Sequence, residues 1–149
     1  KVEGESMMPN LQNGEYILVN KVDYLFHSPQ RGDVIVFRAV PAGAPNRDFI
    51  KRVIGLPGET VAVHGGTVYI NNHALAESYI TQRPTYTFPA QRVPKGSYFV
   101  LGDNRNNSED SHLWKWLPRG DIIGKAWVSY WPVRDVHVFE TASGLPFGL

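Results

Sequence analysis

A lysine inside an apolar run is the first candidate for chemistry in this sequence. Residues 49–58 read Phe-Ile-Lys-Arg-Val-Ile-Gly-Leu-Pro-Gly, a predicted strand that the Leu-Pro-Gly turn ends. Because side chains alternate along a strand, Lys51 shares a face with Phe49 and Val53, and Arg52 lies on the other face. A buried lysine can lose its proton and act as a base, whereas an arginine stays charged and usually reaches water. The alternative is that both cations extend into solvent from an edge strand.

Other kinds of chemistry find little support, which leaves Lys51 and Ser6. The absence of cysteine excludes thiol catalysis and cysteine-type zinc sites. No glycine-rich phosphate loop opens a helix and no serine lies in a nucleophile elbow, although a Ser-His-Asp triad is not excluded by counting. We therefore predict no metal and no cofactor. The histidines lack the paired spacing of a metal site: His27, His64, His73, His112 and His137.

Length and composition indicate one buried domain with room for a small appendage, since the chain has 149 residues of which 42% are hydrophobic. A net charge of +1, with lysine and arginine scattered, argues against nucleic acid as a partner. No apolar run approaches the roughly 18 residues of a membrane span, so the chain as given is expected to be soluble. Because it begins at Lys1, we expect that an N-terminal segment is missing, which could be a membrane anchor.

The elements that must position Lys51 and Ser6 are predicted to be strands throughout. Turn signals and apolar runs predict strands, besides the lysine strand, over residues 16–19, 34–37, 60–64, 67–70, 98–101 and 122–131. Residues 41–47 are predicted to be a loop, and residues 73–98 to be irregular, because prolines recur there. Residues 102–112 form a polar loop, and no helix is predicted.

Four motifs, in this order, give the chain its family likeness. Gly-Glu-Ser-Met-Met-Pro at 4–9, Gly-Asp-Val-Ile-Val-Phe at 32–37, the lysine strand, and Gly-Asp-Asn-Arg at 102–105 with Asp-Ser at 110–111 resemble the sequence boxes of bacterial type I signal peptidases. The resemblance implies an all-β fold, with mainly antiparallel sheets in a barrel-like catalytic core of the type shared with self-cleaving repressors. It also implies a small β-rich second lobe. We predict a core of residues 1–58 plus 99–135, an inserted lobe of 59–98 and a tail of 136–149.

The resemblance also implies a Ser-Lys dyad without cofactor, in which Ser6 is the nucleophile, Lys51 the general base and Ser108 the hydroxyl that orients the lysine amine. For this role the pKa of Lys51 must fall from about 10.4 toward about 7 to 8, and burial produces such shifts. The polar loop would be braced by Asp103, Arg105 and Asp110. Three positions depart from the family: Gly4 stands where some members have a serine, Asn10 where threonine is common, and His112 where arginine is usual.

The implied activity is that of a serine endopeptidase that removes signal peptides from exported preproteins after Ala-x-Ala sites. Its implied location is the extracytoplasmic face of the bacterial cytoplasmic membrane. Small residues at the cut would enter shallow pockets, with plain core packing as the alternative for each lining residue. The predicted substrate contacts are Val2, Met7, Leu11, Asp48, Phe49 and Ile50.

Two other functions stay open at this point. The same dyad occurs in self-cleaving regulatory domains, and a β-barrel without catalysis could use the same residues for binding alone. We further expect contact with an anionic membrane surface through Trp114, Trp116 and the apolar residues 145–149, unless the tryptophans pack in the core. Finally, Ala74-Leu75-Ala76 before Glu77 matches the Ala-x-Ala pattern and predicts slow autolysis.

Overall fold

Strand-forming segments assemble into two antiparallel sheets in the computed structural model, which describes residues 4–131. The larger sheet has the order β1-β10-β2-β3-β8-β9, and the smaller has the order β6-β5-β4-β7. The strands are β1 (Tyr16–Asn20), β2 (Val34–Ala39), β3 (Ala44–Gly55), β4 (Thr60–His64), β5 (Thr67–Ile70), β6 (His73–Ala74), β7 (Phe88–Arg92), β8 (Ser97–Leu101), β9 (Leu117–Pro118) and β10 (Ile122–Trp131). The predicted architecture of mainly antiparallel sheets is confirmed.

Three short helical turns and the short strands β6, β7 and β9 were not predicted. The turns are α1 (Asp23–Phe26), α2 (Ser111–Trp114) and the 3-10 turn η1 (Arg119–Asp121). The segment predicted to be irregular contains β6 and β7, and β3 begins at Ala44, inside the predicted loop. Pro89 lies in β7, which is an edge strand of its sheet. An edge tolerates proline because its missing N–H faces away from the ladder.

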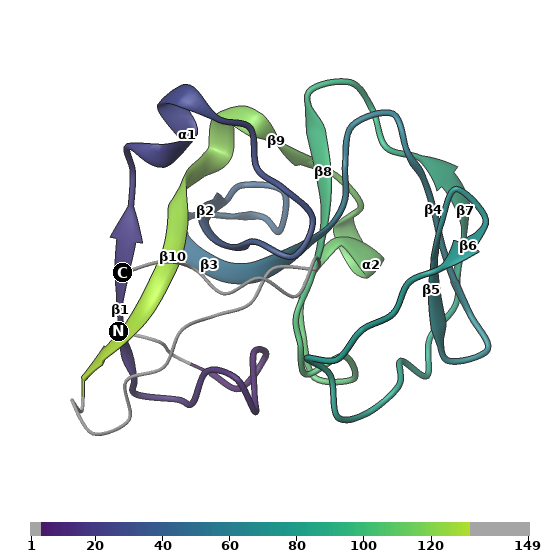
Figure 1. The fold of residues 1–149 in the computed structure, drawn as a ribbon, viewed down its shortest axis with the longest axis horizontal. Coiled ribbons are helices and arrows are strands. Elements are labelled where there is room, and N and C mark those ends of the chain that lie inside the picture. The colour runs from purple at the N-terminus through teal and green to yellow at the C-terminus, as the bar shows by residue number, and fades with distance from the viewer. Residues whose placement is uncertain (1–3, 132–149) are drawn as a thin grey trace.

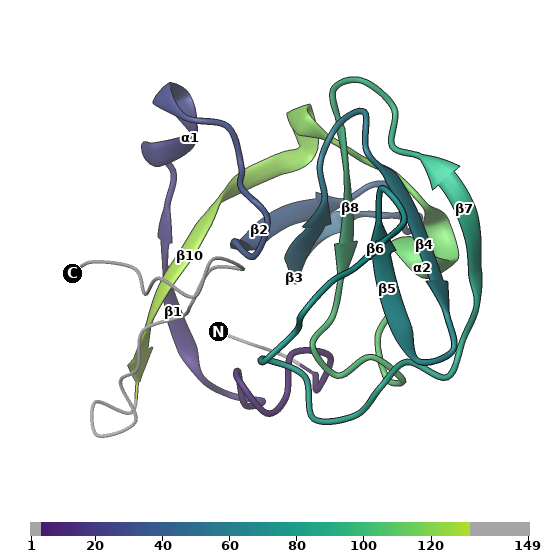
Figure 2. The same cartoon turned by 45° about the vertical axis from the view of Figure 1, so that its right-hand side comes forward.

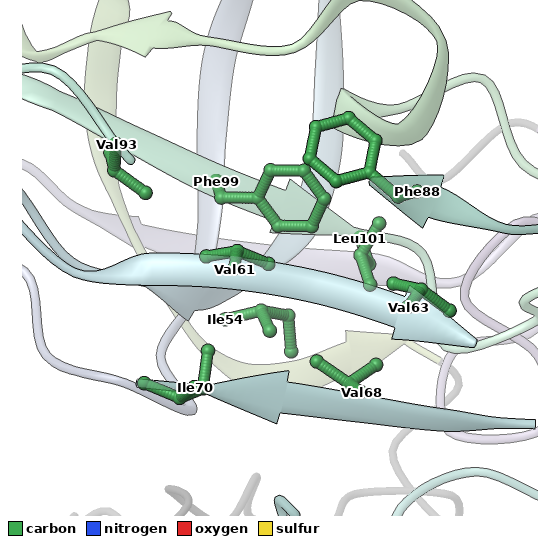
Figure 3. Packing of buried hydrophobic residues seen from close by; sticks show 9 residues of the cluster. All are labelled: Ile54, Val61, Val63, Val68, Ile70, Phe88, Val93, Phe99 and Leu101. Carbon is green, nitrogen blue, oxygen red and sulfur yellow. The ribbon is translucent and has the colours of Figure 1, made fainter. Parts of the chain in front are cut away.

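The two sheets share one hydrophobic core (Figure 3). Ile54 of β3 and Phe99 of β8 pack with Val61 of β4 and Phe88 of β7, and the rings of Phe88 and Phe99 lie 4.9 Å apart. Gly55 permits this approach, because a Cβ there would lie 2.6 Å from the Val61 side chain. The 59–98 boundary of the lobe stays a prediction, and the predicted tail lies outside the described residues.

Figure 1 and Figure 2 place the smaller sheet at one side of the molecule and the β1–β10 pair at the other, with β8 between them. The lysine strand β3 runs through the middle of the larger sheet, paired with β2 on one side and β8 on the other. Because β3 is a central strand, its second half has protein along both edges. In residues 4–131, no helix has the length and apolar character that a membrane crossing requires.

Both tryptophans of the predicted membrane-docking segment pack against the hydrophobic clusters, as in the alternative given for them. The ring of Trp114 meets Phe37 edge-on at 5.9 Å, and Trp116 lies 6.1 Å from Phe99. Both side chains are half-buried partners of the hydrophobic clusters. Segment 112–117 alternates between more buried and exposed residues, so it turns its indoles toward the clusters and leaves Leu113 exposed. The other predicted docking residues, 145–149, lie outside the described residues.

Candidate active site

Ser6 and Lys51 meet, although 44 residues separate them in the sequence. The amine Nζ of Lys51 lies 2.7 Å from the hydroxyl Oγ of Ser6, which is hydrogen-bonding distance. Lys51 is only 5% exposed, and its Nζ stands 5.1 Å from the ring centroid of Phe49. This is the face that strand alternation predicts for the lysine. A buried amine in contact with a serine hydroxyl is an arrangement in which the amine can take the hydroxyl proton.

Burial lowers the pKa of Lys51 from its usual value to about 8. The carboxylates of Asp110, Glu109 and Asp103 act in the opposite direction, because they favour the protonated amine. Burial is the larger effect, so the pKa settles below that of an ordinary lysine. A base with such a pKa is partly unprotonated near neutral pH, as general-base catalysis requires.

The turn that carries Ser6 is tied to the Gly-Asp-Asn-Arg loop by main-chain contacts. The Ser6 carbonyl accepts a hydrogen bond from the Asn104 N–H at 2.7 Å. The Glu5 carbonyl accepts from the Asn104 side-chain amide at 2.9 Å and from the Met8 N–H at 3.1 Å. These bonds fix the backbone on either side of the serine. The position of the hydroxyl therefore depends on a loop almost a hundred residues away in the sequence.

Asp103 is held by an arginine for which the sequence predicted another environment. Arg52, expected to reach water, is 2% exposed and forms a bidentate pair with Asp103, both bonds at 2.8 Å. It also donates to the Gly32 carbonyl at 2.9 Å. Both cations of the lysine strand are thus buried, one beside the serine and one beside an acid. The sequence contained a signal for this pair. An acid in the polar loop and an arginine in an apolar run each need a partner of opposite charge when they are buried.

Asp110 caps α2 and reaches back to the strand before it. One of its oxygens accepts from the Gly102 N–H at 2.9 Å, and the other accepts from the His112 N–H at 3.0 Å. The ring Nδ1 of His112 also contacts this second oxygen, and the ring stacks on Tyr86 with centroids 3.8 Å apart. The histidine that departs from the family pattern therefore still provides a partner for the carboxylate.

Ser108 lies beside the reacting pair without a hydrogen bond to it. Its Oγ is buried and has no hydrogen-bond partner among the described residues. It packs against Gly102, where a Cβ would lie 2.2 Å from this oxygen. The predicted contact between the hydroxyl and the Lys51 amine is not formed in this structure, so the orienting role of Ser108 stays a prediction.

Ser6 and Lys51 lie in the wall of an open cleft of about 810 Å³. Its lining includes Ser6, Lys51 and Ser108 together with the predicted contacts Asp48, Phe49 and Ile50. Met7 and Leu11, at 1% and 0% exposure, instead pack in the core with Val34 and Ala126. This burial favours core packing for both side chains. Val2 lies outside the described residues.

Comparison with known proteins agrees with this site. The family model described as "Signal peptidase, peptidase S26" matches residues 1–131. The chain belongs to this family. It is 50% identical to Signal peptidase I of Leptolyngbya laminosa over 138 residues, which are 89% of this chain and 68% of that protein. It is 48% identical to Probable signal peptidase I-1 of Synechocystis, covering 88% of this chain and 69% of the relative.

A solved structure supports the same assignment at the level of the fold. The crystal structure of a signal peptidase I from Enterococcus faecalis matches with a TM-score of 0.59 and 35% sequence identity, over 66% of this chain and 97% of that one. The family membership and the all-β fold that the sequence motifs predicted are confirmed. The chain is thus a serine endopeptidase of the signal peptidase family.

Proposed function

We propose that this signal peptidase removes signal peptides from exported preproteins by a Ser-Lys dyad, with Ser6 as nucleophile and Lys51 as general base. The observation that carries the dyad is the 2.7 Å contact between the buried amine of Lys51 and the hydroxyl of Ser6. Membership of the family and the similarity to signal peptidase I relatives support the substrate class. The roles of the individual residues are supported by geometry and by the lowered pKa of the amine.

The chemistry that this arrangement supports has two halves. The neutral Lys51 amine takes the Ser6 hydroxyl proton while Oγ attacks the carbonyl carbon of the scissile peptide bond. The resulting ammonium gives that proton to the leaving amine, so the peptide bond breaks and an acyl-serine ester remains. Water, deprotonated by the same amine, then hydrolyses the ester. With glycine at position 4, main-chain N–H groups, including that of Ser6, would stabilise the oxyanion.

The backbone beside the cleft supports binding of an extended peptide. Residues 48–50 of β3 pair with β2 on one edge, whereas the described pairing of β3 with β8 begins only at Arg52. The other edge of residues 48–50 is thus available to a substrate strand, and Phe49 and Ile50 contribute apolar walls. This agrees with a peptide that presents Ala-x-Ala in extended form.

The proposed place of action is the extracytoplasmic face of a bacterial cytoplasmic membrane, with preprotein signal peptides and an anionic membrane surface as partners. Family membership supports this location. On the described surface, α1 provides apolar side chains for such a contact, because Leu25 and Phe26 are 76% and 77% exposed. The tryptophans that were first expected to serve this purpose are half-buried against the hydrophobic clusters.

A peptide with Ala-x-Ala before the scissile bond tests the proposal. Ser6→Ala and Lys51→Ala should each remove nearly all turnover, and the double variant should be little worse than either one, because the two groups act as a unit. Ser108→Ala should slow turnover and leave the fold intact, since its hydroxyl has no hydrogen bond to any residue in 4–131. Rates are compared by mass spectrometry of the products. Full activity in Lys51→Ala would overturn the dyad.

A further inference from the structure

A buried ion pair joins the smaller lobe to the active-site loop. The carboxylate of Glu77 accepts two hydrogen bonds from the guanidinium of Arg105, one of them at 2.7 Å from Nη1. The side chains of Arg105 and Glu77 are 0% and 5% exposed. Removing one member of such a pair leaves the other charge buried without compensation. The loop that contains Arg105 therefore depends on an acid from outside the four family motifs.

Tyr79, two residues further on, contacts both arginines of the site. Its hydroxyl donates to Glu77 at 2.9 Å, and its ring centroid lies 4.0 Å from the guanidinium carbon of Arg52. Its carbonyl accepts at 2.7 Å from the Asn10 amide, which also donates to Asp103 at 2.8 Å. Segment 77–79 thus touches the serine turn, the lysine strand and the polar loop.

Each of these contacts reaches a residue that neighbours Ser6 or Lys51, and not the reacting atoms themselves. Arg52 directly follows Lys51 on β3. Arg105 donates through Nε to the Gly102 carbonyl at 3.0 Å. Gly102 in turn packs against the active site, because a Cβ there would lie 2.6 Å from the Ser6 carbonyl. A shift of Arg105 or Arg52 would therefore be passed to the serine or to the lysine.

We propose that Glu77 and Tyr79 are positioning residues for the reaction, which hold Ser6 and Lys51 in register through Arg105 and Arg52. The proposal rests on the proposed dyad function and names two residues of the smaller lobe that act on it. They do not touch the substrate or the reacting atoms. Their effect should appear in the chemical step, because a small misplacement of reacting groups slows catalysis more than it weakens binding.

Glu77→Gln is the variant to test, and Glu59→Gln is its matched control. Glu59 also pairs with an arginine through two bonds, at 2.6 and 3.0 Å to Arg31, but Arg31 then donates to the Ile54 carbonyl and not to the active-site loop. Glu77→Gln should lower kcat about tenfold to a hundredfold with KM changed less than about twofold. Glu59→Gln should leave both constants near those of the wild type.

Two further variants separate positioning from simple loss of stability. Glu77→Asp retains the carboxylate and should recover part of the lost kcat. Tyr79→Phe retains the ring over Arg52 and loses only the hydroxyl bond to Glu77, so its kcat should fall less than that of Glu77→Gln. All variants are assayed well below their unfolding temperatures, with folding checked by near-ultraviolet circular dichroism. A fall in kcat that tracks unfolding temperature alone would overturn the proposal.

The pKa of Lys51, followed by NMR of its side-chain carbon, gives a readout that needs no turnover. The charged groups that face this amine are Asp110, Glu109 and Asp103. Displacement of the loop should change this pKa in Glu77→Gln, because both the burial of the amine and its distance from these carboxylates change, and the rising limb of the pH profile should move with it, whereas Glu59→Gln should move neither. If the wild type fails to cut but the pKa moves, the dyad function fails and the positioning role stands. If cleavage depends on Ser6 yet Glu77→Gln behaves like Glu59→Gln, positioning fails alone.

Discussion

In the proposed dyad, Lys51 accepts a proton only as the neutral amine, so its pKa sets the acidic limit of activity. With that pKa lowered to about 8 by burial, kcat/KM should rise about tenfold per pH unit below this value and level off above it. A profile from about pH 6 to about pH 10, recorded with the Ala-x-Ala peptide, measures the limb. A flat profile across this range would contradict the assignment of Lys51 as the base.

The same burial makes Lys51 unfavourable for stability. Its pKa is about 8 in the folded chain and about 10.4 when unfolded, so between these values the unfolded state binds more protons and stability rises with pH. Below pH 8 the cost is fully present and amounts to about 3 kcal/mol. Lys51→Met should therefore be inactive yet more stable than the wild type at neutral pH.

Urea unfolding of Lys51→Met and wild type, each at several pH values, measures this difference. The stability advantage of the variant should shrink as the pH approaches about 10.4, above which both the folded and the unfolded wild type hold Lys51 as the neutral amine. A constant gap at all pH values would assign the gain to better packing and not to the buried charge. Equal stability at neutral pH would show that Lys51 is solvated in the folded state.

Among the connecting elements, the start of the polar loop depends on a glycine. A Cβ at Gly102 would lie 2.2 Å from Ser108 Oγ and 2.6 Å from the Ser6 carbonyl, so Gly102→Ala must displace the serine turn or the loop. Gly120→Ala is the control, because a Cβ there meets nothing within 4 Å. Gly102→Ala should lose most activity and about 1 to 3 kcal/mol of stability by overpacking. Gly120→Ala should retain both, and equal behaviour of the two variants would contradict this role of Gly102.

Helices and strands could be predicted where they form through interactions between residues close in the sequence, and were missed where they depend on residues far away in the sequence. The hairpin 60–64 and 67–70 and the strand 122–131 agree with the structure in their bounds, because alternation and a Gly-Gly turn are local signals. β7 was missed because Pro89 is tolerated only through its place at a sheet edge. α2 was missed because Asp110 caps a single turn whose neighbours come from β8.

The residues of the site also divide into those with a local sequence signal and those without one. Ser6, Lys51 and the loop acids could be proposed from motifs, since those motifs are local in sequence. Glu77 and Tyr79 lie in a segment without a motif, and their importance depends on which arginines they meet in the fold. The burial of Arg52 could not be derived from alternation alone, because either face of a central strand can be covered. Local sequence patterns could therefore not predict the partners that the smaller lobe contributes.

At the scale of the whole molecule, the smaller sheet packs directly on the strand that carries Lys51. It shares a hydrophobic core with β3 and β8, and segment 77–79, which follows β6, reaches the polar network beside the dyad. A local opening of this lobe would therefore disturb the active site as well. Stability near the site and stability of the lobe are coupled, as expected when a buried network crosses between two sheets.

This coupling determines how readily the chain can cut itself at the Ala-x-Ala sequence of the lobe. Ala74 and Ala76 are exposed, but Ala74 is paired with Tyr69 in β6, and the Leu75 N–H donates to the Val68 carbonyl at 2.8 Å. The residue after the bond, Glu77, is anchored in its pair with Arg105. To enter another molecule's cleft, residues 74–77 must first leave these partners, so cleavage after Ala76 should be slow.

Substrates that cannot cut themselves isolate this barrier from any change in activity. Chains with Ser6→Ala alone, Ser6→Ala with Glu77→Gln and Ser6→Ala with Glu59→Gln are each incubated with a trace of wild-type enzyme, and the fragments are weighed by mass spectrometry. Loss of the Arg105 pair should release the segment, so the Glu77→Gln chain should be cut after Ala76 several times faster than the other two. Cleavage of all three at one rate would show that the ion pair does not protect the bond. Identical fragments without added enzyme would rule out Ser6-dependent autolysis.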